Sequence, residues 1–293
     1  MKHFQVQSVI TAPDRPAGRG YKLSETPVKQ YARQHSLPVF QPESLDETLI
    51  QTVSRLDADF IVLVAYGKIL PERLIRCARL AALNVHPSLL PSYRGAAPME
   101  WALLNGEKET GITVISLERK LDSGGILTQK VVPVTIEDDI FSLRTKLMQI
   151  APPLLLEAIQ KVLSGERPKR QEGKVSYAPR LSKAHGEINW NNSAWRIYNQ
   201  IRALADWPVA YTFLPLTKTR KIFRIKKASL ISLSGTHGKP GEVLETEKNL
   251  MVACGEGIIC PVLVQLEGKK LLPTLEFLKG IRLPAGVILG NSL

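Results

Sequence analysis

The chain has 293 residues, 44% of them hydrophobic and 23% charged, a length and composition that predict a soluble globular protein with two ordinary domains. No apolar run approaches the roughly 20 residues of a membrane-spanning helix. The start of the chain lacks the charged and apolar regions of a signal peptide, so we expect a cytoplasmic protein. The net charge is +12. Almost all of this excess lies in the second part of the chain. From Gly165 onward there are 20 Lys and Arg residues and 10 Asp and Glu residues, whereas up to Ser164 there are 19 and 17. This asymmetry favours a polyanionic partner.

The first part of the chain alternates strand-like and helix-like segments. We expect strands at 6–13, 37–42, 59–66, 81–86 and 111–118, and helices at 26–35, 44–56, 71–78 and 97–106. Thr26 followed by Pro27 is typical of a helix start. Ser44 followed three residues later by Glu47 predicts a capping box. The segment 59–66 is nearly all apolar, as in a buried parallel strand, and the alternation as a whole predicts an α/β doubly wound sheet.

A polar segment rich in Gly and Pro interrupts this pattern, and we expect an interdomain linker at 165–181. Beyond it, a helix-like segment at 193–204 precedes short strand candidates with Gly-bearing turns, which indicate a small β-barrel. These candidates are 210–214, 221–233, 241–246 and 250–266. The predicted organisation is therefore a first domain at 1–164, the linker, and a basic second domain at 182–293.

Three cysteines, Cys77, Cys254 and Cys260, show neither a CxxC spacing nor a partnered histidine. In a chain without export signals this pattern predicts reduced and mostly buried thiols. We therefore expect no structural zinc and no other metal.

Two polar residues stand at the end of the strand predicted at 81–86. Asn84 and His86 are two residues apart, so their side chains share one face of the strand, and ligands of open α/β sheets bind at the carboxyl ends of strands. His86 could act as general acid or base, and the Asn84 amide could stabilise an oxyanion. Taken alone, the pair is equally compatible with a structural, hydrogen-bonded histidine.

A second strand end carries Asp122, followed by Ser123 and two glycines. An Asp in such a loop is ordinarily a turn residue, but one that faced His86 could orient the imidazole or accept a proton. An Asn, a His and an Asp together suit acyl or formyl transfer to an amine, because a tetrahedral intermediate carries an oxyanion and protons must move. No dinucleotide-binding, P-loop or metal signature competes with this interpretation.

The segment 84–98, NVHPSLLPSYRGAAP, with LDSGG downstream resembles the signature of transferases and hydrolases that use 10-formyltetrahydrofolate. The resemblance implies that Asn84, His86 and Asp122 are catalytic. It also implies a Rossmann-like formyltransferase domain in which Ser88, Leu89, Leu90 and Pro91 form the folate-binding loop. The prolines would fix a backbone wall for the folate beside the histidine.

Within this family, the segment 12–32 resembles the loop with which methionyl-tRNA formyltransferases approach the tRNA acceptor end, and Arg19 matches its key arginine. By composition alone this segment is a mobile, solvated connection, although basic residues there would suit phosphate contacts. The segments 180–190 and 201–214 are similar to the start of the same enzymes' second domain. The resemblance implies that this domain is an OB-like barrel, a fold used for nucleic acids.

The segment 217–227 places six positive charges in eleven residues without an acid, interleaved with apolar residues. One interpretation is a solvated edge strand protected by lysines. The charge of the domain favours the other, an RNA-facing surface that includes Lys218, Arg220 and Lys221.

The start of the chain departs from the family pattern. Members begin with a βα unit that carries a Gly-Thr-Pro turn, whereas this chain begins at the second strand. In a sheet of order 3-2-1-4-5 the first strand is central. We therefore expect 6–13 and 37–42 to be separated from 59–66 and 81–86, and strand edges to be left unpaired.

The resemblance, together with the basic second domain, implies formyl transfer from 10-formyltetrahydrofolate to the amino group of methionyl initiator tRNA, and we expect a monomer. Two alternatives remain open at this point. One is a formyltransferase of the same family acting on a nucleotide-linked amine. The other is a catalytically inactive RNA-binding remnant.

Overall fold

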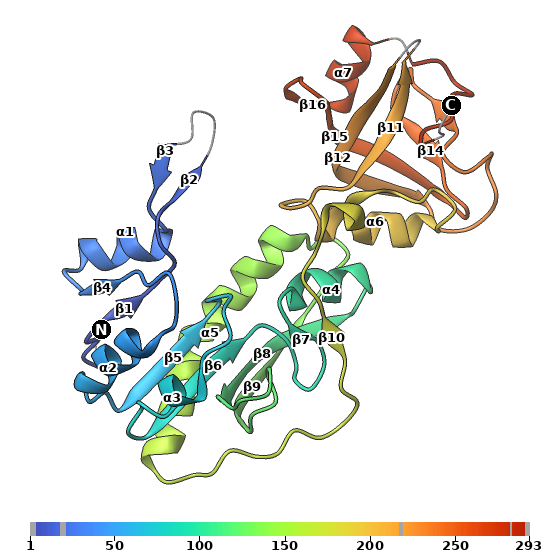
Figure 1. Ribbon diagram of the computed structural model, residues 1–293. Helices are drawn as coiled ribbons and strands as arrows, with labels where there is room; N and C mark the ends of the chain where they lie inside the picture. The colour runs from blue at the N-terminus through green and yellow to red at the C-terminus, as the bar shows by residue number, and fades with distance from the viewer. Residues whose placement is uncertain (1–3, 18–21, 217–218, 282, 291–293) are drawn as a thin grey trace. The chain divides into compact units, whose positions relative to one another are not determined.

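The computed structural model describes residues 4–17, 22–216, 219–281 and 283–290, and Figure 1 follows the chain through its helices and strands. The chain forms two compact units, each assembled from three stretches. The first unit comprises Met1–His86, Thr113–Gln129 and Ala151–Lys174, and the second comprises Pro87–Ile112, Lys130–Ile150 and Val175–Leu293.

The first unit begins with two small pairs of strands. β1 (Val9–Ile10) pairs in parallel with β4 (Val39–Phe40), and β2 (Arg15–Ala17) pairs antiparallel with β3 (Lys22–Ser24). Helix α1 (Pro27–Gln34) begins as predicted, because the Thr26 hydroxyl accepts a hydrogen bond from the Lys29 N–H at 3.1 Å. Pro27 costs no hydrogen bond at that position, since the first helical N–H groups have no partner within the helix.

The capping box predicted for α2 (Glu47–Arg55) is wrong. The helix is capped by Asp46, whose carboxylate accepts from the Leu49 N–H at 3.2 Å. Ser44 lies outside the helix and donates its hydroxyl to the same carboxylate at 2.7 Å. Both residues are good caps, and the one nearer to the first helical turn takes the role.

A four-stranded sheet forms the centre of the α/β part, with the order β5-β6-β8-β9. Its strands are β5 (Phe60–Val64), β6 (Ala81–His86), β8 (Glu109–Ser116) and β9 (Ile126–Pro133). β5 and β6, which are joined through the short helix α3 (Glu72–Ile75), run parallel, whereas β6 and β8 run antiparallel. The sheet is thus mixed, and the strand that ends in His86 lies between two neighbours.

The strand predicted at 59–66 runs parallel to a neighbour, as expected, but the prediction that it is buried is wrong. Among the strands that the structure describes, β5 lies at the edge of this sheet and pairs with β6 alone, while β1 and β4 form a separate sheet. Val62 is 41% exposed and Val64 58% exposed. The expected separation of the first strands from 59–66 and 81–86 is therefore present, and an apolar strand lies at an open edge.

Replacing Val64 with Lys is expected to reduce self-association without loss of stability. A charged side chain on an exposed edge blocks pairing with a second chain, and an exposed substitution changes stability by only about 0.5 kcal/mol. Static light scattering over a concentration series measures the effect. Met148→Lys, at an exposed apolar position on a helix, is the matched control. Equal effects of the two variants would show that edge pairing is not the cause.

Helix α5 (Ile140–Leu163) has 24 residues and contains Pro152 and Pro153. The buried residues on its apolar side include Leu143, Leu147, Leu154, Ala158 and Ile159. A pair of prolines inside a helix removes backbone hydrogen bonds and argues against helix from sequence. The burial of this apolar side offsets that loss, and the helix was not predicted from the sequence.

The second unit contains an antiparallel sheet of order β11-β12-β15-β14-β13, with β16 paired to β15. Register shifts in β12 bend this strand of 14 residues, so that the sheet curls into a half-barrel, the form taken by the expected OB-like domain. Its strands are β11 (Tyr211–Leu216), β12 (Thr219–Ser232), β13 (Val243–Glu245), β14 (Met251–Ala253), β15 (Ile258–Leu266) and β16 (Leu271–Pro273). Helices α6 (Ala194–Ala203) and α7 (Thr274–Gly280) belong to the same unit as this sheet.

Shorter elements complete the second unit. β7 (Arg94–Gly95) pairs in parallel with β10 (Tyr177–Ala178), and helix α4 (Pro98–Leu104) packs against α6. A 3-10 helix spans Lys183–Gly186. Segments far apart in the sequence are therefore joined within this unit.

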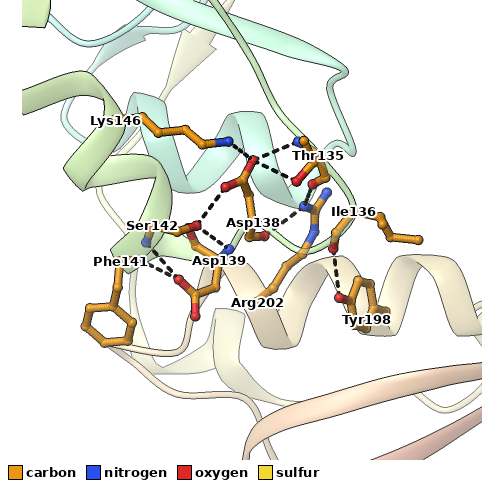
Figure 2. Close-up of polar contacts among 9 residues, drawn as sticks. All are labelled: Thr135, Ile136, Asp138, Asp139, Phe141, Ser142, Lys146, Tyr198 and Arg202. Atoms are coloured by element: carbon orange, nitrogen blue, oxygen red, sulfur yellow. Dashed lines mark hydrogen bonds and ion pairs between the residues drawn. The ribbon is translucent and has the colours of Figure 1, made fainter. Parts of the chain in front are cut away.

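A buried polar network attaches α6 to the start of α5. Figure 2 shows Lys146, Thr135 and Ser142 converging on the carboxylate of Asp138, at distances between 2.5 and 3.1 Å. Arg202 donates to the carbonyl oxygens of Thr135 at 2.8 Å and Asp138 at 2.9 Å. Burial by itself raises the pKa of Asp138, but the hydrogen bonds from these neighbours outweigh it and hold the pKa below its usual value.

The three cysteines are free thiols, as expected, and Cys254 and Cys260 are buried. Burial raises the pKa of Cys254 to about 12. Because the thiolate is the reactive form, this residue is a packing residue of the half-barrel and not a nucleophile. Within the part of the chain that the structure describes, no helix is both long and apolar enough to cross a membrane.

Candidate active site

Asn84 and His86 lie on β6, near its carboxyl end. In the sheet they are opposite Ile115 and Thr113 of β8, two residues apart along both strands, so their side chains share a face. His86 is only 4% exposed and Asn84 7%. Burial of two polar side chains requires polar partners.

Asp122 supplies a partner from the loop between β8 and β9. Its carboxylate accepts a hydrogen bond from the Asn84 amide at 3.2 Å, and its other oxygen lies 3.7 Å from Nδ1 of His86. The second distance is longer than a direct hydrogen bond, but it places a negative charge where a protonated imidazole would be stabilised. The structure thus brings together the three residues predicted as catalytic, with the Asp122 side chain only 8% exposed.

The loop holds Asp122 in an uncommon backbone conformation. Its φ is +47°, in the left-handed region that costs roughly 1–2 kcal/mol for a residue with a side chain. Two residues later, a Cβ on Gly124 would lie 1.7 Å from the Ser116 carbonyl oxygen, so only glycine fits. Asp122 is therefore both the turn residue and the partner of Asn84, two interpretations that the sequence presented as alternatives.

Gln171 also belongs to this site, although it lies in the segment 165–181 that was predicted to be a linker. Its side-chain amide donates to the Asp122 and Gly124 carbonyl oxygens, at 2.8 Å each. No local pattern predicts such a contact, because the partners are 49 and 47 residues apart in the chain.

The predicted folate loop follows β6 directly in the chain and belongs to the second unit. Ser88 and Leu90 are buried, and the Ser88 hydroxyl donates to the Ser92 carbonyl at 2.6 Å. The Leu90–Pro91 peptide is cis, and the Ser176 N–H donates to the Pro91 carbonyl at 3.3 Å. The loop is therefore fixed by its own bonds and by a contact with the end of the predicted linker.

The predicted tRNA-binding cations are only partly described. Arg19 and Lys218 lie outside the described residues, and for Arg220 the structure gives the backbone alone, opposite Pro215. Lys221 is half-buried on β12, opposite Leu214. The backbone thus places Arg220 and Lys221 at the end of the hairpin formed by β11 and β12.

A metal centre is not part of the described site. Across residues 4–17, 22–216, 219–281 and 283–290, no group of three or more His, Cys, Asp or Glu side chains is arranged to hold a metal ion. The polar groups that the site offers for chemistry are the amide, imidazole and carboxylate described above.

Solved structures share this fold. HypX from Aquifex aeolicus in complex with tetrahydrofolic acid superposes with a TM-score of 0.63 at 18% identity, over 98% of this chain and 51% of that one. An N-formyltransferase from Helicobacter canadensis, in complex with folinic acid and dTDP-3-aminofucose, gives 0.62 at 18% identity, over 88% and 99% of the two chains.

Sequence comparisons identify the family. The Formyl transferase family model matches residues 1–159, and the model of its C-terminal domain matches 180–282. A methionyl-tRNA formyltransferase of Geobacter sulfurreducens is 41% identical over 98% of this chain and 90% of its own length. Another, from Thermodesulfovibrio yellowstonii, is 41% identical over 95% and 89%. With both domain models matched and this identity maintained over nearly its full length, the chain belongs to the formyl transferase family.

Proposed function

We propose that this chain transfers a formyl group from 10-formyltetrahydrofolate to the amino group of methionine esterified to initiator tRNA. The observation that carries the proposal is the buried contact of Asn84, His86 and Asp122 at the end of β6. The relatives that are about 40% identical over nearly the full length are named methionyl-tRNA formyltransferases. Solved structures of the same fold contain tetrahydrofolic acid and folinic acid, which supports a folate co-substrate.

The reaction requires one C–N bond to form and another to break. The methionine amine attacks the formyl carbon, and a tetrahedral intermediate with a negatively charged oxygen results. When this intermediate collapses, the bond from the formyl carbon to N10 of the folate breaks. The proton lost by the attacking amine is balanced by the proton that N10 gains.

Each of the three side chains has a chemical role in this scheme. The Asn84 amide carries two N–H groups, so it can keep its bond to Asp122 while it donates to the oxyanion. His86 moves the proton from the amine towards N10. Asp122 stabilises the imidazolium that forms during the transfer and holds Asn84 in place.

The two substrates use different parts of the chain. The loop Ser88–Pro91 forms the backbone wall for the folate, since its bonds within the loop keep it rigid. Arg19, Lys218, Arg220 and Lys221 contact tRNA phosphates. The first domain, 1–164, supplies the chemistry, and the basic domain, 182–293, follows the linker 165–181 and holds the tRNA. The chain acts as a monomer in the cytoplasm.

A formyl-transfer assay tests the proposal directly. Initiator tRNA charged with methionine is compared with uncharged tRNA and with a dTDP-linked amino sugar, each in the presence of 10-formyltetrahydrofolate. Formylation of the charged tRNA alone is expected. Formylation of the sugar alone would instead assign the chain to the sugar N-formyltransferases, and inactivity on all three would leave an RNA-binding protein.

Binding of tRNA is expected to weaken steeply with salt. Each phosphate contact contributes a slope of about −0.9 to the dependence of log affinity on log salt concentration. Neutralising Lys218, Arg220 and Lys221 together is therefore expected to flatten the slope of KM for tRNA by about 2–3.

The matched control for this experiment removes equal charge from exposed arginines of the first unit, Arg33, Arg55 and Arg76. These changes are expected to leave the slope as it is in the unaltered chain. A KM for tRNA that does not depend on salt would contradict the assignment of the basic surface.

A further inference from the structure

The chain between the two family models is bound to the candidate active site along part of its length. Lys169 and Ile126, at the start of β9, exchange two backbone hydrogen bonds at 2.7 and 2.8 Å. A Cβ on Gly125 would lie 2.6 Å from Cβ of Pro168, so the two backbones pack closely. The segment 165–174 is therefore a fixed part of the first unit and not only a tether.

Gln171 extends this contact to the loop that carries Asp122. Its single side-chain nitrogen donates both hydrogens, one to the Asp122 carbonyl and one to the Gly124 carbonyl. Two carbonyl oxygens of one turn are thus held by one planar group. A side chain that lacks an NH2 group at this distance cannot satisfy both.

The geometry at Asp122 depends on such support. A residue at a φ of +47° keeps this conformation only where the surrounding structure determines it. The carboxylate of the same residue has its contacts with Asn84 at 3.2 Å and with His86 at 3.7 Å. A shift of about 1 Å in the position of a catalytic group can cost roughly 100-fold in rate.

We infer that Gln171 is a positioning residue for formyl transfer, which holds the backbone of Asp122 so that its carboxylate faces Asn84 and His86. The role rests on the proposed function of the site, and it assigns to the segment between the domains a part in the reaction. Because Gln171 reaches the backbone of Asp122 and not the reacting atoms, its loss affects the rate of the chemical step more than the binding of either substrate.

Two variants test this inference. Gln171→Met keeps the length of the side chain and removes its donors, while Gln171→Glu places a carboxylate against two carbonyl oxygens. Both are expected to lower kcat by about 10–100-fold, with KM for 10-formyltetrahydrofolate and for tRNA changed less than about threefold. Glu172→Ala, at the exposed neighbouring position, is the matched control and is expected to have an unchanged kcat.

Hydrogen exchange supplies a measurement that does not require activity. In both variants the amides of residues 120–126 are expected to exchange faster, while those of the half-barrel remain as protected as before. Inactivity of the unaltered chain on every amine tested would contradict the proposed function but not this structural role. An unchanged kcat in an active enzyme, a rise confined to KM, or unchanged exchange in the loop would overturn the inference.

Discussion

Replacing His86 with Ala is expected to lower kcat for formyl transfer by about 10²–10⁴-fold, the usual cost of losing a general acid or base. The imidazole is buried at the end of β6, with the Asp122 carboxylate 3.7 Å from Nδ1. Steady-state kinetics with charged initiator tRNA measure the loss.

The affinity for 10-formyltetrahydrofolate is expected to change much less in this variant. The loop Ser88–Pro91 keeps its own hydrogen bonds when the imidazole is removed. Asn84→Ala and Asp122→Ala are expected to resemble His86→Ala, and combinations are expected to be non-additive because the three residues act as a unit. His35→Ala, at an exposed histidine after α1, is the matched control. Near-normal turnover of the His86 variant would contradict the proposed role of His86 in proton transfer.

Replacing Arg202 with Met is expected to destabilise the second unit by roughly 2 kcal/mol or more. The change removes the donor to the carbonyl oxygen of Asp138 and to the side-chain oxygen of Asn199, while the Thr135 carbonyl keeps the Asp138 N–H at 3.3 Å. Each buried group left unsatisfied costs about 1–3 kcal/mol. The loss is large beside the roughly 5–15 kcal/mol of a typical domain.

Urea unfolding followed by circular dichroism measures this effect as a lower midpoint at an unchanged slope. Arg202→Lys is expected to recover little, because an ammonium cannot reproduce the planar fork of a guanidinium. Arg196→Ala, at an exposed position of the same helix, is expected to stay within about 0.5 kcal/mol of the unaltered chain. If the Arg202 variants unfold at the same midpoint as Arg196→Ala, the network of Figure 2 contributes nothing to stability.

Local features of the sequence determined much of the candidate site. Asn84 and His86 share a face because side chains alternate along any strand, and the strand itself is recognisable from its apolar residues. Thr26 and Pro27 mark a helix start whatever surrounds them. The resemblance of 84–98 to a family signature then connected these residues to Asp122, which the structure places beside them.

Features that depend on competing local signals were less well predicted. Asp46 and Ser44 are both good helix caps, and the sequence does not show which one the first turn will use. Pro152 and Pro153 argue against a helix locally, yet α5 continues through them because its apolar residues are buried. The apolar composition of 59–66 predicts a strand but not its neighbours, and β5 lies at an edge with Val64 exposed.

The long-range contacts of Gln171 and Arg202 were decided by the tertiary structure alone. The amide of Gln171 reaches Asp122 across 49 residues, and Arg202 reaches the Thr135 carbonyl across 67. A glutamine in a polar segment and an arginine on a helix have no local feature that distinguishes them from solvated residues. Only folding brings them to buried acceptors, where a hydrogen bond must be made because water is excluded.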